Sequence, residues 1–245
     1  MSKFIVIPTY NEVENLPIMA QALFALPIDD LHLLVVDDGS PDGTGQIAES
    51  LKDKFPGKVE VLHRQGKQGL GTAYIQGFGI ALDKGADQIV QMDADFSHDP
   101  LKVVPLLDQL NEYDMALGSR YIKGGSLDEK WAAWRKGLSS FGNFYARTIL
   151  GLPFLDVTGG FRAWRRETLL GLPLDRVRSQ GYAFQVEMAY ITHVLGYSIE
   201  ELPIYFAERE RGDSKMSLGI QVEAAKRVWS ILYEYRDLKK KKPAE

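Results

Sequence analysis

The chain has 245 residues, 45% of them hydrophobic and 25% charged, which is the composition of an ordinary globular protein. Its formal net charge of −4 at pH 7 excludes a general electrostatic attraction to nucleic acid, so we expect no nucleic-acid partner. The absence of cysteine excludes disulfides, thiolate metal sites and a cysteine nucleophile. We expect neither a signal peptide nor a membrane-spanning helix, because no apolar stretch reaches the required length of roughly 18–20 residues.

The first half of the chain alternates short apolar runs with helical patterns. We expect strands at residues 4–7, 31–36, 59–62, 88–92 and 115–117, and helices at about 14–26, 44–54, 71–84 and 99–112. Continuous apolar strands separated by helices are typical of a parallel sheet covered on both faces. The sequence therefore predicts an α/β fold whose ligands bind beyond the carboxyl ends of the strands.

The second half is less regular. We expect helices at 131–150 and 182–195, a glycine-containing loop at 156–162 before a short strand, a strand-like run at 199–206 and a charged loop at 208–215. The first of these helices is interrupted by Gly137 and Gly142. The clearest amphipathic helix covers 220–238, and its apolar stripe contains Ala225, Val228, Trp229, Leu232 and Tyr235.

Acidic or polar residues follow three of the predicted strands. They are PTYNE at 8–12, Asp37-Asp38, and Asp93-Ala94-Asp95. Each segment alone is explained as a turn, because Asp, Asn and Gly favour turns. The carboxyl ends of parallel strands meet at one edge of a sheet, so the three together indicate a binding site there.

The Asp93-Ala94-Asp95 segment is the sharpest of these signals. Residues i and i+2 of extended backbone point the same way, so the carboxylates of Asp93 and Asp95 can hold Mg²⁺ or Mn²⁺ against a diphosphate. His98 is near this pair, but a loop histidine in contact with solvent is the simpler interpretation. No dinucleotide-binding or P-loop fingerprint occurs. The glycines around Lys67 fit a flexible turn and a phosphate contact equally well, and Lys67 itself is more simply a surface charge.

Basic residues gather in the loops of the second half. Arg120 follows the fifth predicted strand, Arg135 and Ser139 share one helical face, and Arg209, Arg211 and Lys215 occupy one loop. Arginine binds phosphate with two parallel hydrogen bonds. Surface salt bridges explain most arginines, so phosphate binding by these residues is a hypothesis.

Taken together, these segments resemble the family 2 glycosyltransferases, and within them the polyprenol-phosphate (dolichol-phosphate) mannose synthases. The motifs, which span about residues 3 to 218, are PTYNE at 8–12, VVDDGSPDGT at 35–44, QMDADFSHDP at 91–100, GSRY at 118–121, TGGFR at 158–162 and RERGDSK at 209–215. The resemblance implies a GT-A fold, Mg²⁺ or Mn²⁺ as cofactor, and transfer of mannose from GDP-mannose to polyprenyl (dolichyl) phosphate with inversion. It also implies one catalytic domain, with a Rossmann-like nucleotide-sugar-binding half at 1–119, an acceptor-binding half at 120–218, and an amphipathic helix with a basic tail at 219–245.

The resemblance assigns roles to individual residues. The nucleotide sugar would be held by Pro8, Tyr10, Glu12, Asp37, Asp38, Lys67, Asp93, Ala94, Asp95, Arg209 and Lys215. The metal would be held by Asp93 and Asp95. The catalytic residues would be Asp95 together with Arg120, Arg135 and Ser139, of which the last three would bind the acceptor phosphate.

The chain departs from some members of the family at two points. Ser97 replaces a glutamine that helps to ligate the metal in some relatives, so Ser97 or water must substitute for it. Some relatives also have carboxyl-terminal membrane helices. We expect none here, because the sequence resembles the soluble form, which in some organisms works with a small membrane protein. We expect a cytoplasmic protein that associates peripherally with the membrane surface, with helix 220–238 and the lysines after it as one means of attachment.

Two alternatives stay open at this point. One is a family 2 enzyme with another donor, such as UDP-glucose, and the other is a non-catalytic subunit that binds a nucleotide sugar. A lipid phosphate is already anionic at pH 7, so it requires orientation and charge compensation more than a general base. A hydroxyl acceptor would require a nearby base, for which Asp156 is a candidate.

Overall fold

A seven-stranded sheet runs through the computed structural model, which describes residues 1–208 and 218–238. The strands of this sheet, in the order in which they lie side by side, are β3 (Val59–His63), β2 (Leu31–Asp37), β1 (Lys3–Thr9), β4 (Gln88–Gln91), β7 (Arg162–Arg165), β5 (Met115–Ser119) and β8 (Ile199–Pro203). All neighbouring pairs are parallel except those made by β7, which is antiparallel to both β4 and β5. The chain has an α/β fold with a mostly parallel central sheet, as the sequence predicts.

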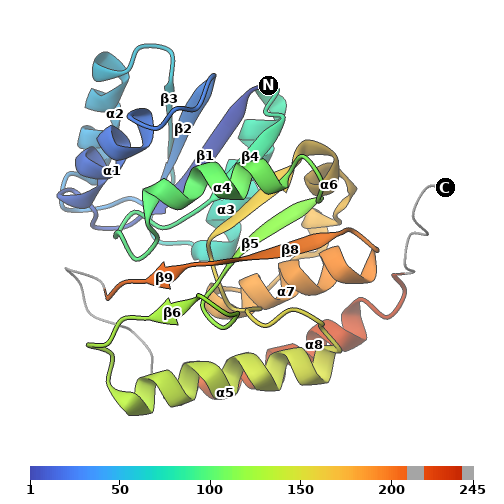
Figure 1. Cartoon of the computed structure of the whole chain (residues 1–245). Coiled ribbons are helices and arrows are strands. Elements are labelled where there is room, and N and C mark those ends of the chain that lie inside the picture. Colours follow the sequence, from blue (N-terminus) through green and yellow to red (C-terminus); the bar gives the residue numbers. More distant parts are fainter. Residues whose placement is uncertain (209–217, 239–245) are drawn as a thin grey trace.

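Helices cover both faces of the sheet (Figure 1). The helices of the first part of the chain are α1 (Asn15–Phe24), α2 (Thr44–Lys54), α3 (Leu70–Asp83) and α4 (Val103–Gln109), the last preceded by the 3₁₀ turn η1 (Pro100–Lys102). Those of the second part are α5 (Ala133–Leu150), α6 (Arg166–Gly171), α7 (Gly181–Val194) and α8 (Leu218–Glu234), with the 3₁₀ turn η2 (Leu174–Arg176) before α7.

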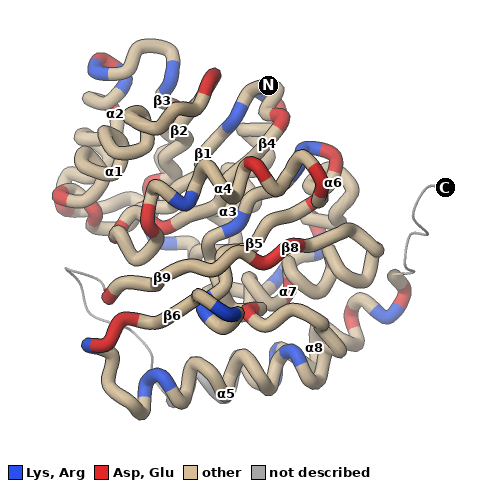
Figure 2. Tube along the Cα trace, in the orientation of Figure 1, with Lys and Arg blue, Asp and Glu red and all other residues tan. Residues whose placement is uncertain are grey.

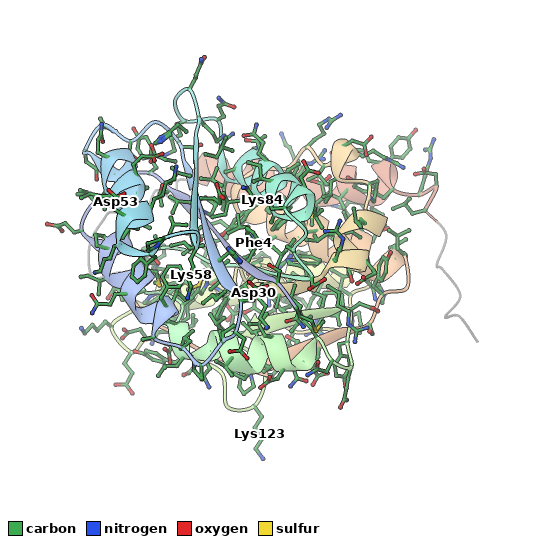
Figure 3. The ribbon with its side chains drawn as sticks, turned by 90° about the horizontal axis from the view of Figure 1, so that it is seen from above. Phe4, Asp30, Asp53, Lys58, Lys84 and Lys123 are labelled. Carbon is green, nitrogen blue, oxygen red and sulfur yellow. The ribbon has the colours of Figure 1, made fainter. Side chains whose placement is uncertain are left out.

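Alternation along the strands divides the core into two layers. In β1, Phe4 and Val6 face a core shared with α3, α7 and α8, whereas Ile5 and Ile7 face a core shared with α1, α2 and α4. The side chains of these four residues are at most 2% exposed. Figure 3 shows Phe4 inside the body of the molecule, while Lys123 projects away from it after β5. Burial on both faces explains why the strands are continuous apolar runs.

Strand β7 joins the two halves of the chain in one sheet. Arg162 is in register with Gln91 of β4 and with Leu117 of β5, so a strand of the second half lies between two strands of the first. This places the loop that precedes β7 at the same sheet edge as the carboxyl ends of the parallel strands. The loops after β1, β2, β4 and β5 also begin at this edge.

Three elements differ from the sequence expectation. Helix α5 continues through Gly137 and Gly142, where nothing lies within 4 Å of an added Cβ, because its other face packs Ala146 and Leu150 into the core. The helix expected at 99–112 ends earlier, at Gln109. The strand-like run at 199–206 divides at Ile204 into β8 and β9 (Tyr205–Phe206), and β9 pairs with β6 (Ser126–Leu127) in a second sheet.

Helix α8 packs most of its predicted stripe on the body of the protein. Of that stripe, Val228 and Tyr235 are at most 4% exposed and Leu232 packs on the core, whereas Trp229 is exposed. Ile231, outside the predicted stripe, is also buried. The lysines at 239–242 lie outside the described residues. Figure 2 shows that α5, beside which α8 lies, displays Lys and Arg but no Asp or Glu, unlike most of the surface.

We expect substitutions at two glycines of α3 to have opposite effects on stability. A Cβ on Gly77 would lie 2.4 Å from Cγ1 of Val6, whereas nothing lies within 4 Å of a Cβ on Gly79. Gly77→Ala should therefore lower the free energy of unfolding by about 1–3 kcal/mol, and Gly79→Ala should raise it by up to about 1 kcal/mol through helix propensity. Urea unfolding of both variants measures this, and equal effects would contradict the close packing of α3 on β1.

Candidate active site

The loop after β4 carries the two carboxylates of the Asp93-Ala94-Asp95 segment. The backbone N–H of Asp93 donates to Nδ1 of His98 (3.2 Å), and the N–H of Ser97 donates to Oδ1 of Asp95 (3.0 Å). Tyr74 donates to the carbonyl of Met92 (3.1 Å), and burial raises the pKa of Tyr74 well above its usual value. The loop is thus fixed by two hydrogen bonds within it and by one from Tyr74 of α3 to the residue before it.

Backbone strain accompanies this arrangement. Phe96, between Asp95 and Ser97, has a φ of 59°, a left-handed conformation that is uncommon for a bulky residue. Such conformations persist where the surrounding structure enforces them, and they gather at functional sites. Ala94, between the two aspartates, is buried, so it contributes backbone and packing to the site.

Asp37 and Asp38 end β2 in different surroundings. Asp37 is buried and accepts hydrogen bonds from Thr9 and Ser40, so it closes the turn after the strand. Asp38 forms a buried ion pair with Arg64. Burial raises the pKa of Asp38, and the charge of Arg64 opposes that increase. Both residues lie at the sheet edge. The side chain of Asp38 is connected, through Arg64, to the loop before α3.

The segment after β1 and the segment after β3 are in contact with each other. Nζ of Lys67 lies 4.4 Å from the centroid of the Tyr10 ring, which is a cation–π contact. Glu12 accepts a hydrogen bond from Asn15, and its backbone N–H donates to Thr44. Pro8 is within β1, in register with Val36. The structure thus brings Tyr10 and Lys67 together, although they are distant in the sequence.

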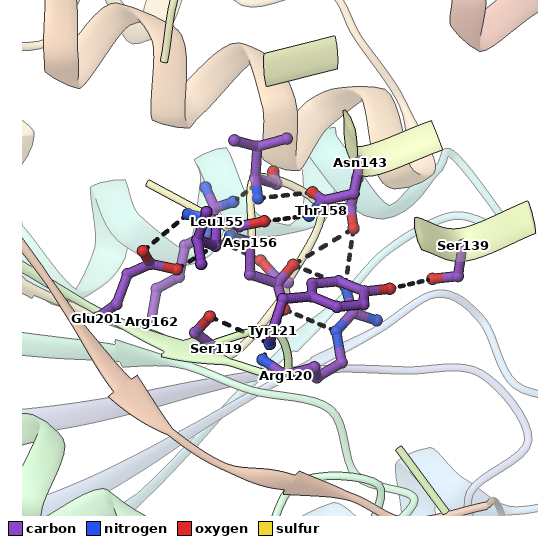
Figure 4. Close-up of polar contacts among 12 residues, drawn as sticks. Ser119, Arg120, Tyr121, Ser139, Asn143, Leu155, Asp156, Thr158, Arg162 and Glu201 are labelled. Atoms are coloured by element: carbon purple, nitrogen blue, oxygen red, sulfur yellow. Dashed lines mark hydrogen bonds and ion pairs between the residues drawn. The ribbon is translucent and has the colours of Figure 1, made fainter. Parts of the chain in front are cut away.

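On the other side of β4, Arg120 is buried against Asp156. Nε of Arg120 donates to Oδ2 of Asp156 and Nη2 donates to Oδ1, both at 2.7 Å, and Nη2 also donates to Thr158 (2.7 Å) (Figure 4). Burial is the largest influence and would raise the pKa of Asp156, but the charge and hydrogen bonds of Arg120, together with the charge of Arg162, keep the pKa below its usual value. Asp156 is therefore an ion-pair partner and not an accessible base.

The loop around Asp156 is held by side chains from several elements. Glu201 of β8 accepts from the backbone N–H groups of Leu155 and Asp156, at 2.7 and 2.9 Å. Asn143 of α5 donates to the carbonyl of Leu155 and accepts from the N–H of Val157 (Figure 4). Arg162 of β7, fully buried, donates to the carbonyls of Gly159 and Val157. These contacts fix Asp156, and through it they fix the orientation of Arg120.

Ser139 and Arg135 reach this region from α5. The hydroxyl groups of Ser139 and Tyr121 are 2.8 Å apart, which joins α5 to the residue after Arg120 (Figure 4). The guanidinium of Arg135 stacks on Trp131, 3.8 Å from the ring centroid, and pairs with Glu208 at 3.6 Å. The structure therefore gathers all three residues of the predicted acceptor site around the loop after β5.

Phe206 connects the carboxylate loop to the arginines, and the sequence analysis did not identify it. Its ring lies 5.3 Å from His98, 5.3 Å from the guanidinium of Arg120 and 5.8 Å from Trp131. His98 in turn stacks on Phe161 and is 1% exposed. The expectation of a solvent-exposed His98 is wrong, because two aromatic rings and the backbone of Asp93 enclose it. No sequence signal distinguished Phe206, because it ends an apolar run, Ile204-Tyr205-Phe206-Ala207, that reads as an ordinary strand.

Three basic residues of the loop that the sequence predicts to bind phosphate follow Glu208. Arg209, Arg211 and Lys215 lie outside the described residues. Glu208, the residue just before Arg209, is held by a hydrogen bond: its backbone N–H donates to Oδ2 of Asp128 (3.0 Å). This bond is the largest cause that lowers the pKa of Asp128 to about 2.

The donor set of the carboxylate loop fits a hard divalent cation. Asp93 and Asp95 offer carboxylate oxygens, and the buried hydroxyl of Ser97, beside them, makes no hydrogen bond to the rest of the described chain. In residues 1–208 and 218–238 no group of three or more His, Cys, Asp or Glu side chains is arranged to hold a metal. Magnesium sites built from one or two carboxylates are completed by substrate phosphates and water. The residues therefore fit a metal that is bound together with a diphosphate.

Comparison with known protein families gives one match that covers most of the chain. The model of the family described as "Glycosyl transferase family 2" matches residues 4–170. This range includes every described residue of the candidate site except Glu201, Phe206 and Glu208.

Two curated proteins are similar over most of their length. The chain is 46% identical over 237 residues to the undecaprenyl-phosphate mannosyltransferase of Micrococcus luteus, covering 96% of each chain. It is 47% identical over 215 residues to the polyprenol monophosphomannose synthase of Mycolicibacterium smegmatis, covering 87% of this chain and 80% of the relative.

Among solved structures, the chain resembles glucosyl-3-phosphoglycerate synthase from Mycobacterium tuberculosis, in a complex with Mn²⁺, UDP-glucose and phosphoglyceric acid. The TM-score is 0.66 at 17% sequence identity, and the match covers 95% of this chain and 79% of that one. At this identity the likeness establishes the shared fold. None of the helices within the described residues has the length and apolar character needed to cross a membrane.

We predict that the buried ion pair is required for stability, unlike a comparable pair at the surface. Asp156→Asn leaves the Arg120 charge buried and unpaired, so it should lower the free energy of unfolding by about 3–5 kcal/mol. Asp237→Asn removes the partner of Arg176 in an exposed pair and should change stability little. Chemical unfolding at pH 7 compares the two, and a small effect of Asp156→Asn would contradict the structural role of the pair.

Proposed function

The chain belongs to glycosyl transferase family 2 and is a transferase, and from this premise we propose that it moves mannose from GDP-mannose to the phosphate of a polyprenyl (dolichyl) phosphate. The product would be polyprenyl phosphate mannose. The names of the two relatives support a polyprenyl phosphate as acceptor and mannose as the transferred sugar. GDP-mannose as the donor is consistent with these two names.

The observation that carries this proposal is the position of the arginines relative to the carboxylate loop. Arg120 and His98, which holds the backbone of Asp93, both contact the ring of Phe206 at 5.3 Å. A diphosphate bound at Asp93 and Asp95 would therefore lie close to an anion bound at Arg120. Transfer of a sugar from one anionic phosphate to another requires positive charge near both phosphates.

The surroundings of Asp156 support an acceptor that needs no general base. Asp156 is fully buried and bound by Arg120, so it is a poor proton acceptor for a hydroxyl substrate. A phosphate monoester is already ionised at pH 7, and the protein has only to orient its oxygen toward the sugar. The bonds between Arg120 and Asp156 use Nε and Nη2, and Nη1 takes part in none of them. We assign Nη1, Arg135 and the Ser139 hydroxyl to the acceptor phosphate.

The nucleotide sugar would occupy the other half of the site. Tyr10, Glu12, Asp37 and Asp38 lie at the ends of β1 and β2, and Lys67 lies over Tyr10. We propose that these residues, with Pro8 and Ala94, hold the nucleotide, and that Arg209 and Lys215 bind the diphosphate. Mg²⁺ or Mn²⁺, held by Asp93 and Asp95, would supply positive charge that stabilises the leaving diphosphate. Attack by the lipid phosphate from the opposite side inverts the anomeric carbon.

The acceptor also bears on where the protein works. A polyprenyl phosphate resides in a bilayer, so we propose a cytoplasmic protein that associates peripherally with the membrane surface. A small membrane protein that assists this contact is a further proposed partner.

The test is an assay that identifies the lipid product. The protein is mixed with Mn²⁺, a polyprenyl phosphate and either GDP-mannose or UDP-glucose, and the lipids are analysed by mass spectrometry. We expect polyprenyl phosphate mannose, formed from GDP-mannose. Exclusive use of UDP-glucose would contradict the donor, and transfer only to an acceptor without phosphate would contradict the lipid phosphate.

We expect turnover to depend on a divalent metal held at Asp95. Asp95→Asn preserves size but removes a charged ligand, so turnover should fall roughly a hundredfold or more. Asp108→Asn, an exposed carboxylate on α4, is the matched control and should leave turnover unchanged. Full activity of folded Asp95→Asn, or of the parent protein in excess EDTA, would exclude the metal site.

A further inference from the structure

A pair of buried amide side chains lies next to the carboxylate loop, apart from the residues assigned above to the metal and the phosphates. Gln91 is the last residue of β4, two positions before Asp93, and it is fully buried. Gln185, near the start of α7, is 3% exposed. Nε2 of Gln91 donates a hydrogen bond to Oε1 of Gln185 at 2.7 Å. The pair therefore connects α7 to the strand that leads into the carboxylate loop.

This pair and its neighbour Arg162 have hydrogen-bonding capacity that the described residues do not use. Arg162 of β7 is the cross-strand partner of Gln91. Oε1 of Gln91 and Nη1 of Arg162 are buried and have no hydrogen-bond partner within residues 1–208 and 218–238. In the same part of the chain, Nε2 of Gln185 donates no hydrogen bond either. An unpaired buried polar group is costly, so three in one cluster indicate a place where a polar ligand binds.

The absence of a side chain at Gly160 leaves room beside the amide of Gln185. A Cβ on Gly160 would lie 3.4 Å from Nε2 of Gln185 and 3.7 Å from Cε1 of His98. Gly160 belongs to the loop that begins at Asp156, whereas His98 accepts a hydrogen bond from the backbone of Asp93. The amide of Gln185 therefore lies where the loop of Asp156 and the carboxylate loop approach each other.

In the proposed reaction, the transferred sugar has to lie between these same two loops. The sugar is joined to the diphosphate, which we place at Asp93 and Asp95, and its anomeric carbon faces the acceptor phosphate, which we place at Arg120. A sugar hydroxyl both donates and accepts hydrogen bonds, so it suits a site that offers an amide N–H. The position and the chemistry of the amide pair thus point to the same ligand.

We propose that Gln185 is a substrate-binding residue that donates a hydrogen bond from Nε2 to a hydroxyl group of the transferred sugar, and that Gln91 is the positioning residue that orients the Gln185 amide. The inference rests on the proposed mannosyl transfer, and it adds a contact by which the protein distinguishes one sugar from another. Binding of the sugar brings oxygen atoms to a cluster whose hydrogen-bonding groups are otherwise unused. A site that binds a substrate hydroxyl discriminates against an analogue that lacks it.

The test measures donor binding by calorimetry, in the presence of Mn²⁺, with two variants that remove the amide contact in different ways. Gln185→Leu combined with Gln91→Leu replaces both amides, so that neither is left unpaired. Gly160→Ala keeps the amide pair but fills the space beside Nε2, at an ordinary contact distance of 3.4 Å. Gly79→Ala is the matched control, because nothing lies within 4 Å of its added Cβ. Thermal unfolding establishes which variants are folded, and Gly160→Ala decides the matter if the double variant is not.

We expect both variants to bind GDP-mannose about tenfold more weakly than the parent protein and to bind GDP with unchanged affinity, because only the contact with the sugar is lost. The control should bind both ligands as the parent protein does. Analogues of GDP-mannose that each lack one sugar hydroxyl identify the contact. One analogue should bind the parent protein about tenfold more weakly than GDP-mannose, whereas the variants should bind that analogue and GDP-mannose equally.

A purely structural role for the amide pair predicts a different pattern. It would weaken the binding of GDP and GDP-mannose by the same factor, and every analogue would keep the ratio of affinities that it has in the parent protein. Either result, or unchanged binding of GDP-mannose by folded Gly160→Ala, would overturn the inference.

Analysis of the lipid product separates this inference from the proposed function. If binding of GDP-mannose depends on the amide pair but the parent protein forms no polyprenyl phosphate mannose, the proposed function fails and the sugar contact stands. If the product forms but the variants bind GDP-mannose as the parent protein does, the proposed function stands and the sugar contact fails. If the parent protein does not bind GDP-mannose, both fail.

Discussion

The ion pair between Arg120 and Asp156 is the interaction on which the proposed acceptor half of the site depends. Both side chains are almost completely buried, at 6% and 0% exposed, and a charge in that position is tolerated only if its partner and its remaining hydrogen bonds are in place. Here the guanidinium binds both carboxylate oxygens, and the backbone around Asp156 is bound by Glu201 and Asn143. Strands β5 and β8 and helix α5 therefore converge on one loop. Surface pairs such as Lys84 with Glu60 contribute little by comparison.

Strand β7 explains how this loop comes to lie beside the carboxylates. Because β7 inserts antiparallel between β4 and β5, the loop before it begins where the parallel strands end. Phe206, in β9, contacts both His98 and Arg120. One aromatic ring thus links the carboxylate loop, where we propose that the metal binds, to the proposed acceptor side.

The sequence was sufficient for the parallel part of the fold and for the carboxylate loop. Apolar runs such as 31–36 are unambiguous when a strand is buried on both faces, and Asp93 and Asp95 follow such a run directly. The partnership of Arg120 with Asp156 was not predictable, because the residues are 36 positions apart and surface arginines are common. The burial of His98 was missed for a similar reason: its neighbours Phe161 and Phe206 come from distant segments. Local pattern predicts elements well, whereas contacts between loops depend on the tertiary fold.

The exposed aromatic side chains of α5 and α8 illustrate the same limit. The periodicity of 220–238 pointed to membrane contact or packing, and the structure buries Val228, Ile231 and Tyr235 while it leaves Trp229 and Tyr233 in solvent. In α5 the glycines suggested an interruption, yet the helix is continuous and presents its own exposed aromatic residues. Which side of an amphipathic helix meets the core is a tertiary property.

The most direct test of the account is a crystal structure of the protein with GDP, Mn²⁺ and a short-chain polyprenyl phosphate. We expect the anomalous signal of manganese beside Asp93 and Asp95, bridged to the diphosphate of GDP, and the phosphate of the lipid at Arg120, Arg135 and Ser139, on the other side of Phe206. A manganese ion bound away from Asp93 and Asp95, or a lipid phosphate remote from Arg120, would contradict the central claim that one sheet edge holds both reacting phosphates.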